Sequence, residues 1–349
     1  MPPCPHGSID DAELAALGPR AVYDFSVNCN PLGPPPGVAA AIASVDVARY
    51  PDDRCLPLRR ALAEETGVPP EGIAVGNGSV ELIWLLAAAY LRQGDGVLVV
   101  GPTFGEYARA AAIHGASVAQ YRSAEESDFR PDLAEVVAAV ARLRPRLVFL
   151  CNPNNPSGVY LGRREVEAVL AACRNGLLVV DEAYMPFVER AESLLDLLDD
   201  GAVLLRSLTK DYALAGLRLG YALAAPEVVR ALEKVRPPWS VNAAAQAAGL
   251  AALADREHLA RARREVAAAR SYLAHELPRL GLRAIPSAAN FLLVRVGDAA
   301  ALRAALLARG CCVRDCTSFG LPEYIRIGLR TVPECGCLVA AMREVLNGG

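Results

Sequence analysis

The sequence predicts an α/β fold, in which a large domain with a mainly parallel sheet covered by helices is accompanied by a smaller α+β domain. Short apolar runs alternate with longer helical patterns through the middle of the chain, which is typical of stacked βαβ units. The chain has 349 residues, of which 53% are apolar, so it can build a large core.

Six runs have the character of buried strands, because they are apolar on both faces. They are residues 73–75, 97–100, 147–151, 177–180, 203–207 and 219–223. Between some of them, apolar residues recur at spacings of three and four, as expected of helices that cover a sheet. These helical patterns are residues 79–91, 106–114, 133–143 and 163–173.

Proline-rich segments lie on both sides of this region. Residues 30–37 (NPLGPPPG) have too few backbone donors for regular structure, so we expect an arm that lies over a surface. After Pro237 and Pro238 a long Arg- and Ala-rich helical stretch, 243–277, precedes apolar runs at 291–296 and 324–327.

These changes in character predict three parts of the chain. Residues 1–40 form an N-terminal arm and part of the small domain, 41–236 form the large domain, and 237–349 form the small C-terminal domain. The Pro-Pro pair favours the second boundary, although a boundary inside a continuous helix is an alternative.

Composition argues against several classes of protein. A net charge of −3 is too balanced for a nucleic-acid-binding or an acidic disordered protein. The longest apolar run, LIWLLAAAYL at 82–91, is about half of what a membrane crossing needs. Because no secretory signal is visible either, we expect a cytoplasmic protein without nucleic-acid or membrane partners.

The ten cysteines are compatible with a reduced compartment. The C-terminal group lacks the paired CxxC spacing of zinc sites and has no nearby histidine, so we predict no metal site. This group consists of Cys311, Cys312, Cys316, Cys335 and Cys337.

Polar residues follow the predicted strands at the points where these end. Because the carboxyl ends of parallel strands meet at one edge of a sheet, such residues are expected to face a common cleft. The segments are GNGS (76–79), 102–104, NPNNPSG (152–158), DEAY (181–184) and SLTK (207–210).

Two of these segments allow more than one interpretation. An ionised Asp181 at the end of an apolar strand needs a cationic partner, although a helix cap or an ion pair with an arginine would also explain it. Gly78 and Ser79 at a helix start offer backbone amides to a single phosphate, but a simple N-cap has the same pattern. No P-loop is present, and no strand is followed by GxGxxG, so a dinucleotide-binding fold is not expected.

Lysine is rare in this chain. Only Lys210 and Lys234 are lysines among the 36 basic residues. Lys234 lies in a helical stretch, where a solvated charge is the ordinary explanation. Lys210 ends the SLTK segment, and a desolvated lysine can lose its proton and form an imine with a carbonyl, which arginine cannot do. Codon bias is an alternative reason for the scarcity.

Together these residues resemble the class I/II aminotransferases of the fold-type I pyridoxal-phosphate enzymes, over nearly the whole chain. The resemblance implies a seven-stranded sheet and the cofactor pyridoxal 5'-phosphate. It implies that Lys210 holds the cofactor as a Schiff base and moves the substrate proton, and that Asp181 pairs with the ring nitrogen. The other implied cofactor contacts are Tyr184 and Asn155 at the phenolic oxygen, Phe104 on the ring, and Gly78, Ser79, Val80, Ser207, Thr209 and Arg218 around the phosphate.

Within this family the chain is most similar to the group of histidinol-phosphate aminotransferase and threonine-phosphate decarboxylase. Tyr50 in RYPD resembles a tyrosine that reaches the neighbouring subunit's phosphate site, which implies a homodimer. Arg326 in YIRIGLR resembles the arginine that holds the substrate carboxylate or phosphate, although a surface arginine on a strand is the alternative. Arg330 could add a second anion contact.

The N-terminal segment leads us to prefer one reaction. DFSVNCNPLGPP (24–35), RDCTSFGL (314–321) and His6 resemble the decarboxylase pattern, and we expect Asn30 and His6 to contact the substrate. The predicted function is therefore a pyridoxal-phosphate enzyme acting on a small, phosphorylated amino acid or amine, most like threonine-phosphate decarboxylase. The alternatives are an aminotransferase of the histidinol-phosphate type that uses 2-oxoglutarate, and a non-catalytic binding domain that keeps the fold.

Overall fold

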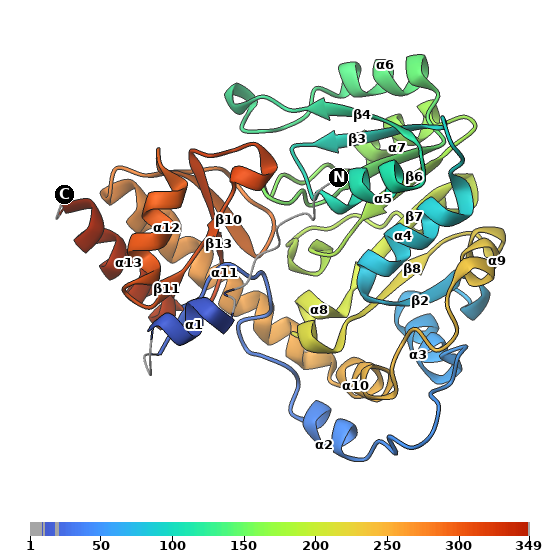
Figure 1. Ribbon diagram of the computed structural model, residues 1–349, viewed down its shortest axis with the longest axis horizontal. Helices are drawn as coiled ribbons and strands as arrows, with labels where there is room; N and C mark the ends of the chain where they lie inside the picture. Colours follow the sequence, from blue (N-terminus) through green and yellow to red (C-terminus); the bar gives the residue numbers. More distant parts are fainter. Residues whose placement is uncertain (1–8, 10, 18–20, 348–349) are drawn as a thin grey trace.

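The computed structural model describes residues 9, 11–17 and 21–347. A seven-stranded sheet forms the larger part of the molecule (Figure 1). The strand order is β2-β8-β7-β6-β5-β3-β4. Strand β8 runs antiparallel to both its neighbours, and all other neighbouring pairs are parallel. The strands are β2 (Ile73–Asn77), β3 (Gly96–Gly101), β4 (Ser117–Arg122), β5 (Leu147–Cys151), β6 (Leu177–Asp181), β7 (Ala202–Ser207) and β8 (Leu219–Leu223).

Helices cover both faces of this sheet, so its central strands alternate between two hydrophobic cores. Val148 and Leu150 of β5 pack into one core, whereas Leu147 and Phe149 pack into the other, as the pleat requires. One core is closed by α3 (Leu56–Thr66), α6 (Leu133–Leu143), α7 (Arg163–Ala172) and α10 (Ala243–Ala254). The opposite core is closed by α4 (Gly78–Tyr90), α5 (Glu106–Ile113) and α9 (Pro226–Val235).

Strand β4 is absent from the runs that we singled out in the sequence. It pairs only with β3, and its residues are half-buried or exposed rather than buried on both faces. An edge strand of this kind lacks the continuous apolar run by which the other six strands could be found.

A smaller antiparallel sheet lies beside the large one, with strand order β12-β13-β10-β9. It shares a core with three helices and with Phe25 of the N-terminal segment. Its strands are β9 (Arg283–Ala284), β10 (Phe291–Arg295), β12 (Arg314–Asp315) and β13 (Tyr324–Gly328), and the helices are α11 (Arg256–Arg279), α12 (Ala299–Leu307) and α13 (Val332–Asn347). The N-terminal strand β1 (Tyr23–Asp24) pairs in parallel with β11 (Cys311–Cys312).

The predicted helical stretch 243–277 is two helices. Helix α10 ends at Ala254, and the side chain of Asp255 accepts a hydrogen bond from the His258 amide, which begins α11. Helix α10 packs on α3 and on α2 (Gly37–Ala43), whereas α11 packs on α13. The domain boundary at residue 237 stays a prediction. Because α10 packs on α2 and α3 whereas α11 packs on α13, these contacts favour a boundary between α10 and α11.

The remaining elements are short. Residues 25–36 form no helix or strand, which agrees with the irregular arm expected there. Within the described ranges, none of the helices combines the length and the apolar character that a membrane span requires. The short helices are α1 (Asp11–Leu17), α8 (Leu208–Asp211), η1 (Pro70–Gly72), η2 (Glu125–Ser127), η3 (Met185–Phe187), η4 (Leu195–Asp200), η5 (Ala215–Leu217) and η6 (Thr317–Phe319).

Candidate active site

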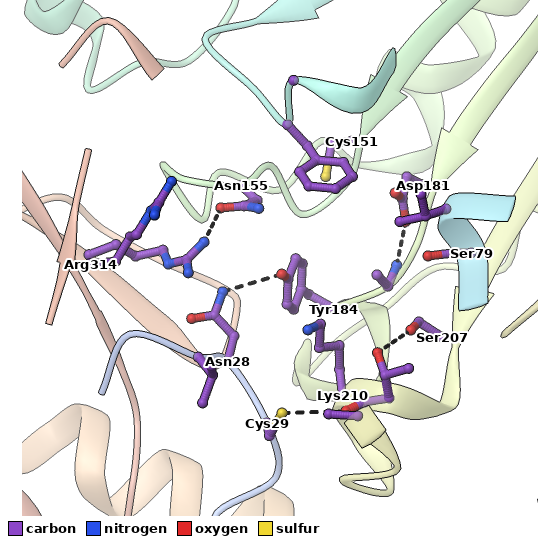
Figure 2. A pocket seen from close by; sticks show the side chains of 18 of the residues that line it. Asn28, Cys29, Ser79, Cys151, Asn155, Asp181, Tyr184, Ser207, Lys210 and Arg314 are labelled. Carbon is purple, nitrogen blue, oxygen red and sulfur yellow. Dashed lines mark hydrogen bonds between the residues drawn. The ribbon is translucent and has the colours of Figure 1, made fainter. Parts of the chain in front are cut away.

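A cavity of about 690 Å³ opens at the edge of the large sheet where its parallel strands end (Figure 2). The last residues of β5, β6 and β7, which are Cys151, Asp181 and Ser207, all line it. This is the edge at which open parallel sheets bind their ligands. The predicted site residues in its lining are Ser79, Val80, Phe104, Asn155, Asp181, Tyr184, Ser207, Thr209, Lys210, Arg218 and Arg326.

Lys210 lies on the single turn of helix α8 that follows β7, and its side chain enters the cavity. Burial lowers the pKa of its amine, and the nearby charges of Arg326 and Arg218 lower it further. Cys29 and Asp181 act in the opposite direction. A lysine with a lowered pKa can be a nucleophile and a proton carrier near neutral pH.

Asp181 is the buried carboxylate of the site, with 5% of its surface exposed. Burial raises its pKa, while a hydrogen bond from the Tyr107 hydroxyl to Oδ2 (2.7 Å) and one from the Ala183 amide to Oδ1 (3.0 Å) lower it. The Tyr107 contact was not predicted. Its signal in the sequence is weak: Tyr107 lies three residues after Phe104, at the start of a helix that covers the sheet.

Tyr184 and Asn155 are joined to two residues from distant parts of the chain. The Tyr184 hydroxyl accepts a hydrogen bond from Asn28 Nδ2 (3.2 Å), and Asn155 Oδ1 accepts one from Arg326 Nη1 (2.5 Å). Burial raises the pKa of Tyr184, so its hydroxyl stays protonated and can donate a hydrogen bond. Asn28 is a further site residue that sequence reasoning missed.

A cradle suited to an anion lies at the start of helix α4. Ser79 lines the cavity there, together with Arg218 and with Ser207, whose hydroxyl is 2.7 Å from that of Thr209. Gly78 does not line the cavity but shapes this corner: its φ is +78°, and a Cβ there would lie 2.9 Å from Arg218 Nη2. Backbone amides at a helix start, hydroxyls and a guanidinium are the groups that bind a phosphate.

The opposite end of the cavity carries two arginines. Arg326 lies on β13 with its Nη2 on the Ser26 carbonyl oxygen (2.7 Å), and Arg314 lies over the Phe319 ring. Within the described chain, the buried Nε of Arg326 and Oδ1 of Asn28 have no hydrogen-bond partner. Both residues line the cavity, so these atoms are available to a ligand.

Besides Gly78, four predicted contacts lie outside the cavity lining or cannot be placed. Asn30, expected to contact substrate, is absent from the cavity lining, and its side-chain amide donates to the Asp211 carbonyl oxygen (2.7 Å). Arg330 is also outside the lining, because it pairs with Glu334 and lies near the Asp24 carbonyl oxygen. His6 falls outside the described residues.

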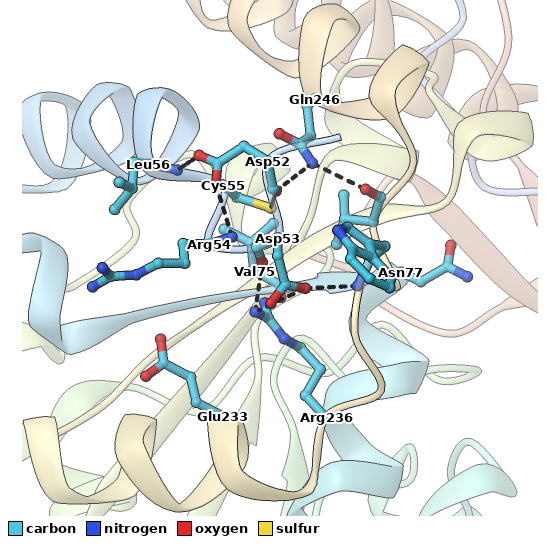
Figure 3. A network of polar contacts seen from close by, with 12 residues as sticks. Asp52, Asp53, Arg54, Cys55, Leu56, Val75, Asn77, Glu233, Arg236 and Gln246 are labelled. Atoms are coloured by element: carbon cyan, nitrogen blue, oxygen red, sulfur yellow. Dashed lines mark hydrogen bonds and ion pairs between the residues drawn. The ribbon is translucent and has the colours of Figure 1, made fainter. Parts of the chain in front are cut away.

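Tyr50, the fourth of these residues, lies outside the cavity of its own chain and is 79% exposed. Its ring stacks on Trp239 at a centroid distance of 4.6 Å. A polar network fixes the segment that follows it (Figure 3): Asp53 accepts the Trp239 amide (2.6 Å) and, through its main-chain oxygen, Arg236 Nη2 (2.6 Å). Hydrogen bonds to Arg236 and Trp239 therefore hold the segment next to the exposed Tyr50 ring in place.

The donor set of the cavity fits pyridoxal 5'-phosphate. This cofactor carries a phosphate, an aldehyde, a phenolic oxygen and a ring nitrogen. The cradle of Ser79 and Arg218 suits the phosphate. Position 78 needs a glycine, because the Cβ of any other residue would displace the Arg218 guanidinium. Lys210 suits the aldehyde, and the buried Asp181 suits a protonated ring nitrogen.

The fold and the site define a pyridoxal 5'-phosphate-dependent enzyme of fold type I. The family profile "Aminotransferase class I and II" matches residues 20–341, and the chain belongs to this family.

Several known proteins that resemble the chain are histidinol-phosphate aminotransferases. Histidinol-phosphate aminotransferase of Moorella thermoacetica is 38% identical over 95% of this chain and 87% of the relative, and that of Symbiobacterium thermophilum is 40% identical over 100% and 97%. The crystal structure of histidinol-phosphate aminotransferase from Sinorhizobium meliloti in complex with pyridoxal-5'-phosphate has a TM-score of 0.88 at 30% identity, covering 97% of this chain and 94% of that one.

These relatives favour the histidinol-phosphate alternative over the threonine-phosphate decarboxylase that we preferred from the sequence. The decarboxylase and lyase prediction finds no support among them. In the N-terminal segment on which that preference rested, Asn28 and Asn30 donate side-chain hydrogen bonds to Tyr184 and to the Asp211 carbonyl oxygen, so both side chains make contacts within the chain.

Proposed function

We propose that this chain is a histidinol-phosphate aminotransferase, which moves an amino group between histidinol phosphate and 2-oxoglutarate. The observation that carries the proposal is full-length similarity, at 38–40% identity, to relatives of that name. The two arginines at one end of the cavity agree with it, because a phosphorylated substrate brings an anionic group that guanidinium groups bind well.

At one end, residues of the large sheet hold the cofactor. When bound, pyridoxal 5'-phosphate supplies a ring that accepts electrons from the bond broken at the substrate carbon. Asp181 would keep the ring nitrogen protonated, and its hydrogen bond from Tyr107 favours the charged carboxylate against the effect of burial, which raises its pKa. Ser79, Ser207 and Arg218 would bind the phosphate.

In the middle of the cavity, Lys210 would attach the cofactor and then carry the proton. Burial lowers the pKa of its amine, which favours the unprotonated form that would remove a proton from the substrate α-carbon and return it at another carbon. Tyr184 and the Nδ2 of Asn155 would donate hydrogen bonds to the phenolic oxygen, because both groups reach the cavity.

At the other end, Arg326 and Arg314 would bind the substrate phosphate. Arg326 is fixed by Asn155 and by the Ser26 carbonyl oxygen, so its Nε–H, which has no partner among the described residues, is held in a fixed direction. Arg314 takes the place that we had assigned to Arg330 as the second anion contact.

The test is to incubate the purified holoenzyme with histidinol phosphate and 2-oxoglutarate, and separately with threonine phosphate. We expect glutamate from the first mixture and no carbon dioxide from the second. Release of carbon dioxide without glutamate would restore the decarboxylase. A protein that binds the cofactor but turns over neither substrate, nor other amino acids with 2-oxoglutarate, would favour the non-catalytic binding domain.

We also propose a homodimer in which Tyr50 reaches the partner's cofactor phosphate. Tyr50 and Trp239 form an exposed stacked pair, and Val47, three residues before Tyr50, is also exposed, so this part of the surface offers apolar groups to a second copy of the chain. Sedimentation should give twice the mass of the chain. The cytoplasmic location expected from the sequence remains a prediction.

A further inference from the structure

The turn that carries Lys210 is held by a segment about 180 residues away. Helix α8 is one turn long, and the last carbonyl groups of any helix have no partner inside it. The carbonyl oxygens of Thr209, Lys210 and Asp211 are instead met by Cys29 Sγ (3.4 Å), Asn30 N (2.8 Å) and Asn30 Nδ2 (2.7 Å). Figure 2 shows Cys29 beside this turn.

Each nitrogen and oxygen atom of Asn30 makes a hydrogen bond. Its Oδ1 accepts the Leu32 amide (2.9 Å), its main-chain oxygen accepts the Gly33 amide (3.2 Å), and only 4% of its surface is exposed. A side chain at this position therefore needs a donor and an acceptor at once. An amide provides both, whereas a carboxylate or an aliphatic side chain does not.

The same segment is anchored on the small sheet at its other end. The Phe25 carbonyl oxygen accepts the Gly328 amide (2.7 Å), and the Asn28 carbonyl oxygen accepts Asn290 Nδ2 (2.9 Å). Residues 25–30 thus form a strap from the small sheet to the Lys210 turn, and Asn30 is the end of this strap that contacts α8.

We propose that Asn30 is a positioning residue for Lys210. By satisfying the carbonyl oxygens of Lys210 and Asp211, it fixes the direction in which the turn projects the amine into the cavity. Small displacements of a reacting group lower rates steeply: about 1 Å can cost on the order of 10²-fold. The proposal rests on the proposed function only in assigning cofactor attachment and proton transfer to Lys210.

The chain offers a direct readout because it has only two lysines, Lys210 and the exposed Lys234. The full chain, freed of cofactor, is labelled with trace acetic anhydride across a pH series, and the two lysine peptides are quantified by mass spectrometry. Lys234 serves as the internal reference in every sample. This measurement needs no substrate, so it stands even if histidinol phosphate is not turned over.

The variants are Asn30→Ala and Asn30→Leu. The second keeps the volume but lacks donor, acceptor and charge, and it carries the test if the first does not fold. We expect the pH at which labelling of Lys210 is half-maximal, its midpoint, to rise toward that of Lys234. An amine that is no longer held in its buried position becomes hydrated, and hydration favours its protonated form. In the holoenzyme we expect kcat to fall by about 10-fold to 100-fold, with KM changed by less than about 3-fold.

The matched control is Asn152→Ala. Asn152 is equally buried and makes two hydrogen bonds with the main chain of Leu161, but it does not touch α8. It should lower the melting temperature and leave the Lys210 midpoint in place. A folded Asn30 variant whose Lys210 midpoint equals that of the unaltered chain would overturn the proposal, as would a change in KM with kcat unaltered, which would identify a substrate contact instead.

Discussion

The two ends of the active-site cavity are built in different ways. At the cofactor end, Ser79, Ser207 and Arg218 lie next to the ends of β2, β7 and β8, so a single sheet positions them. At the substrate end, Arg326 comes from the small sheet and Asn28 from the N-terminal strap, and they meet groups that follow the large sheet.

This difference predicts that the two ends can be altered separately. Side chains on one hydrogen-bonded sheet keep their spacing whatever the other sheet does. The substrate end depends on how the two sheets are held together. Substitutions at one end should therefore change cofactor affinity, and substitutions at the other should change substrate binding. Lys210 lies between the ends and should affect both.

The largest effect is expected for Lys210→Ala. Loss of the attaching and proton-carrying amine should lower kcat by about 10⁴-fold or more. Borohydride treatment of the unaltered holoenzyme should fix the cofactor on the peptide that contains Lys210, and the variant should lose this label. Lys234→Ala is the control and should keep both the label and the activity, since Lys234 is an exposed residue of α9.

The next largest effect is expected for Arg326→Ala. This change removes a buried guanidinium whose hydrogen bonds to an anion are worth about 1.5–3 kcal/mol each, so kcat/KM should fall by about 10²-fold or more. Cofactor affinity should stay within about 3-fold, as absorbance titration would show.

Arg330→Ala is the matched control, because Arg330 is four residues away and outside the cavity lining. We expect its KM for histidinol phosphate to equal that of the unaltered chain. If Arg330→Ala raised KM as much as Arg326→Ala, the assignment of the substrate end would be wrong.

Arg218→Ala should weaken cofactor binding and leave substrate binding nearly unchanged, which is the opposite of what we expect for Arg326→Ala. Without this guanidinium the phosphate cradle loses a charge-assisted contact, and cofactor affinity should fall by about 10-fold. At saturating cofactor, the KM for histidinol phosphate should be nearly unchanged. Equal cofactor affinity in the variant, measured by fluorescence or absorbance titration, would contradict the proposed division of the cavity.

The smallest effect is expected for Tyr107→Phe. The Tyr107 hydroxyl lowers the pKa of Asp181, against the effect of burial, so its removal raises that pKa further. Asp181 would then become protonated at a higher pH, and the acid limb of the kcat profile should shift upward. Activity at alkaline pH should change by less than about 3-fold, because the carboxylate is ionised there in either protein. If the acid limb of the kcat profile did not shift, the hydrogen bond from Tyr107 would not be what lowers the pKa of Asp181.

Much of the cofactor end could be predicted because its chemistry is local in the chain. GNGS, DEAY and SLTK each follow a strand of the predicted sheet, and parallel strands bring their carboxyl ends together. The substrate end could not be predicted in this way. Arg326 and Arg330 are four residues apart and chemically identical, but Arg326 lies on β13 and lines the cavity, whereas Arg330 follows the end of this strand and pairs with Glu334.

The sequence by itself determined the class of fold and, through the family that it resembles, the cofactor. Hydrophobic periodicity specifies which elements form, and the ability of lysine to form an imine, which arginine lacks, is the reason that we propose Lys210 as the point of attachment. Only the tertiary structure decided the contacts of Asn30 and of Tyr107. Their hydrogen bonds to Asp211 and to Asp181 join residues that are 181 and 74 positions apart in the chain, and no local pattern records such contacts. The strap that crosses from one sheet to the other is the clearest case, because its sequence led us to prefer the decarboxylase, which the relatives do not favour, while its contacts carry the proposal that it supports Lys210.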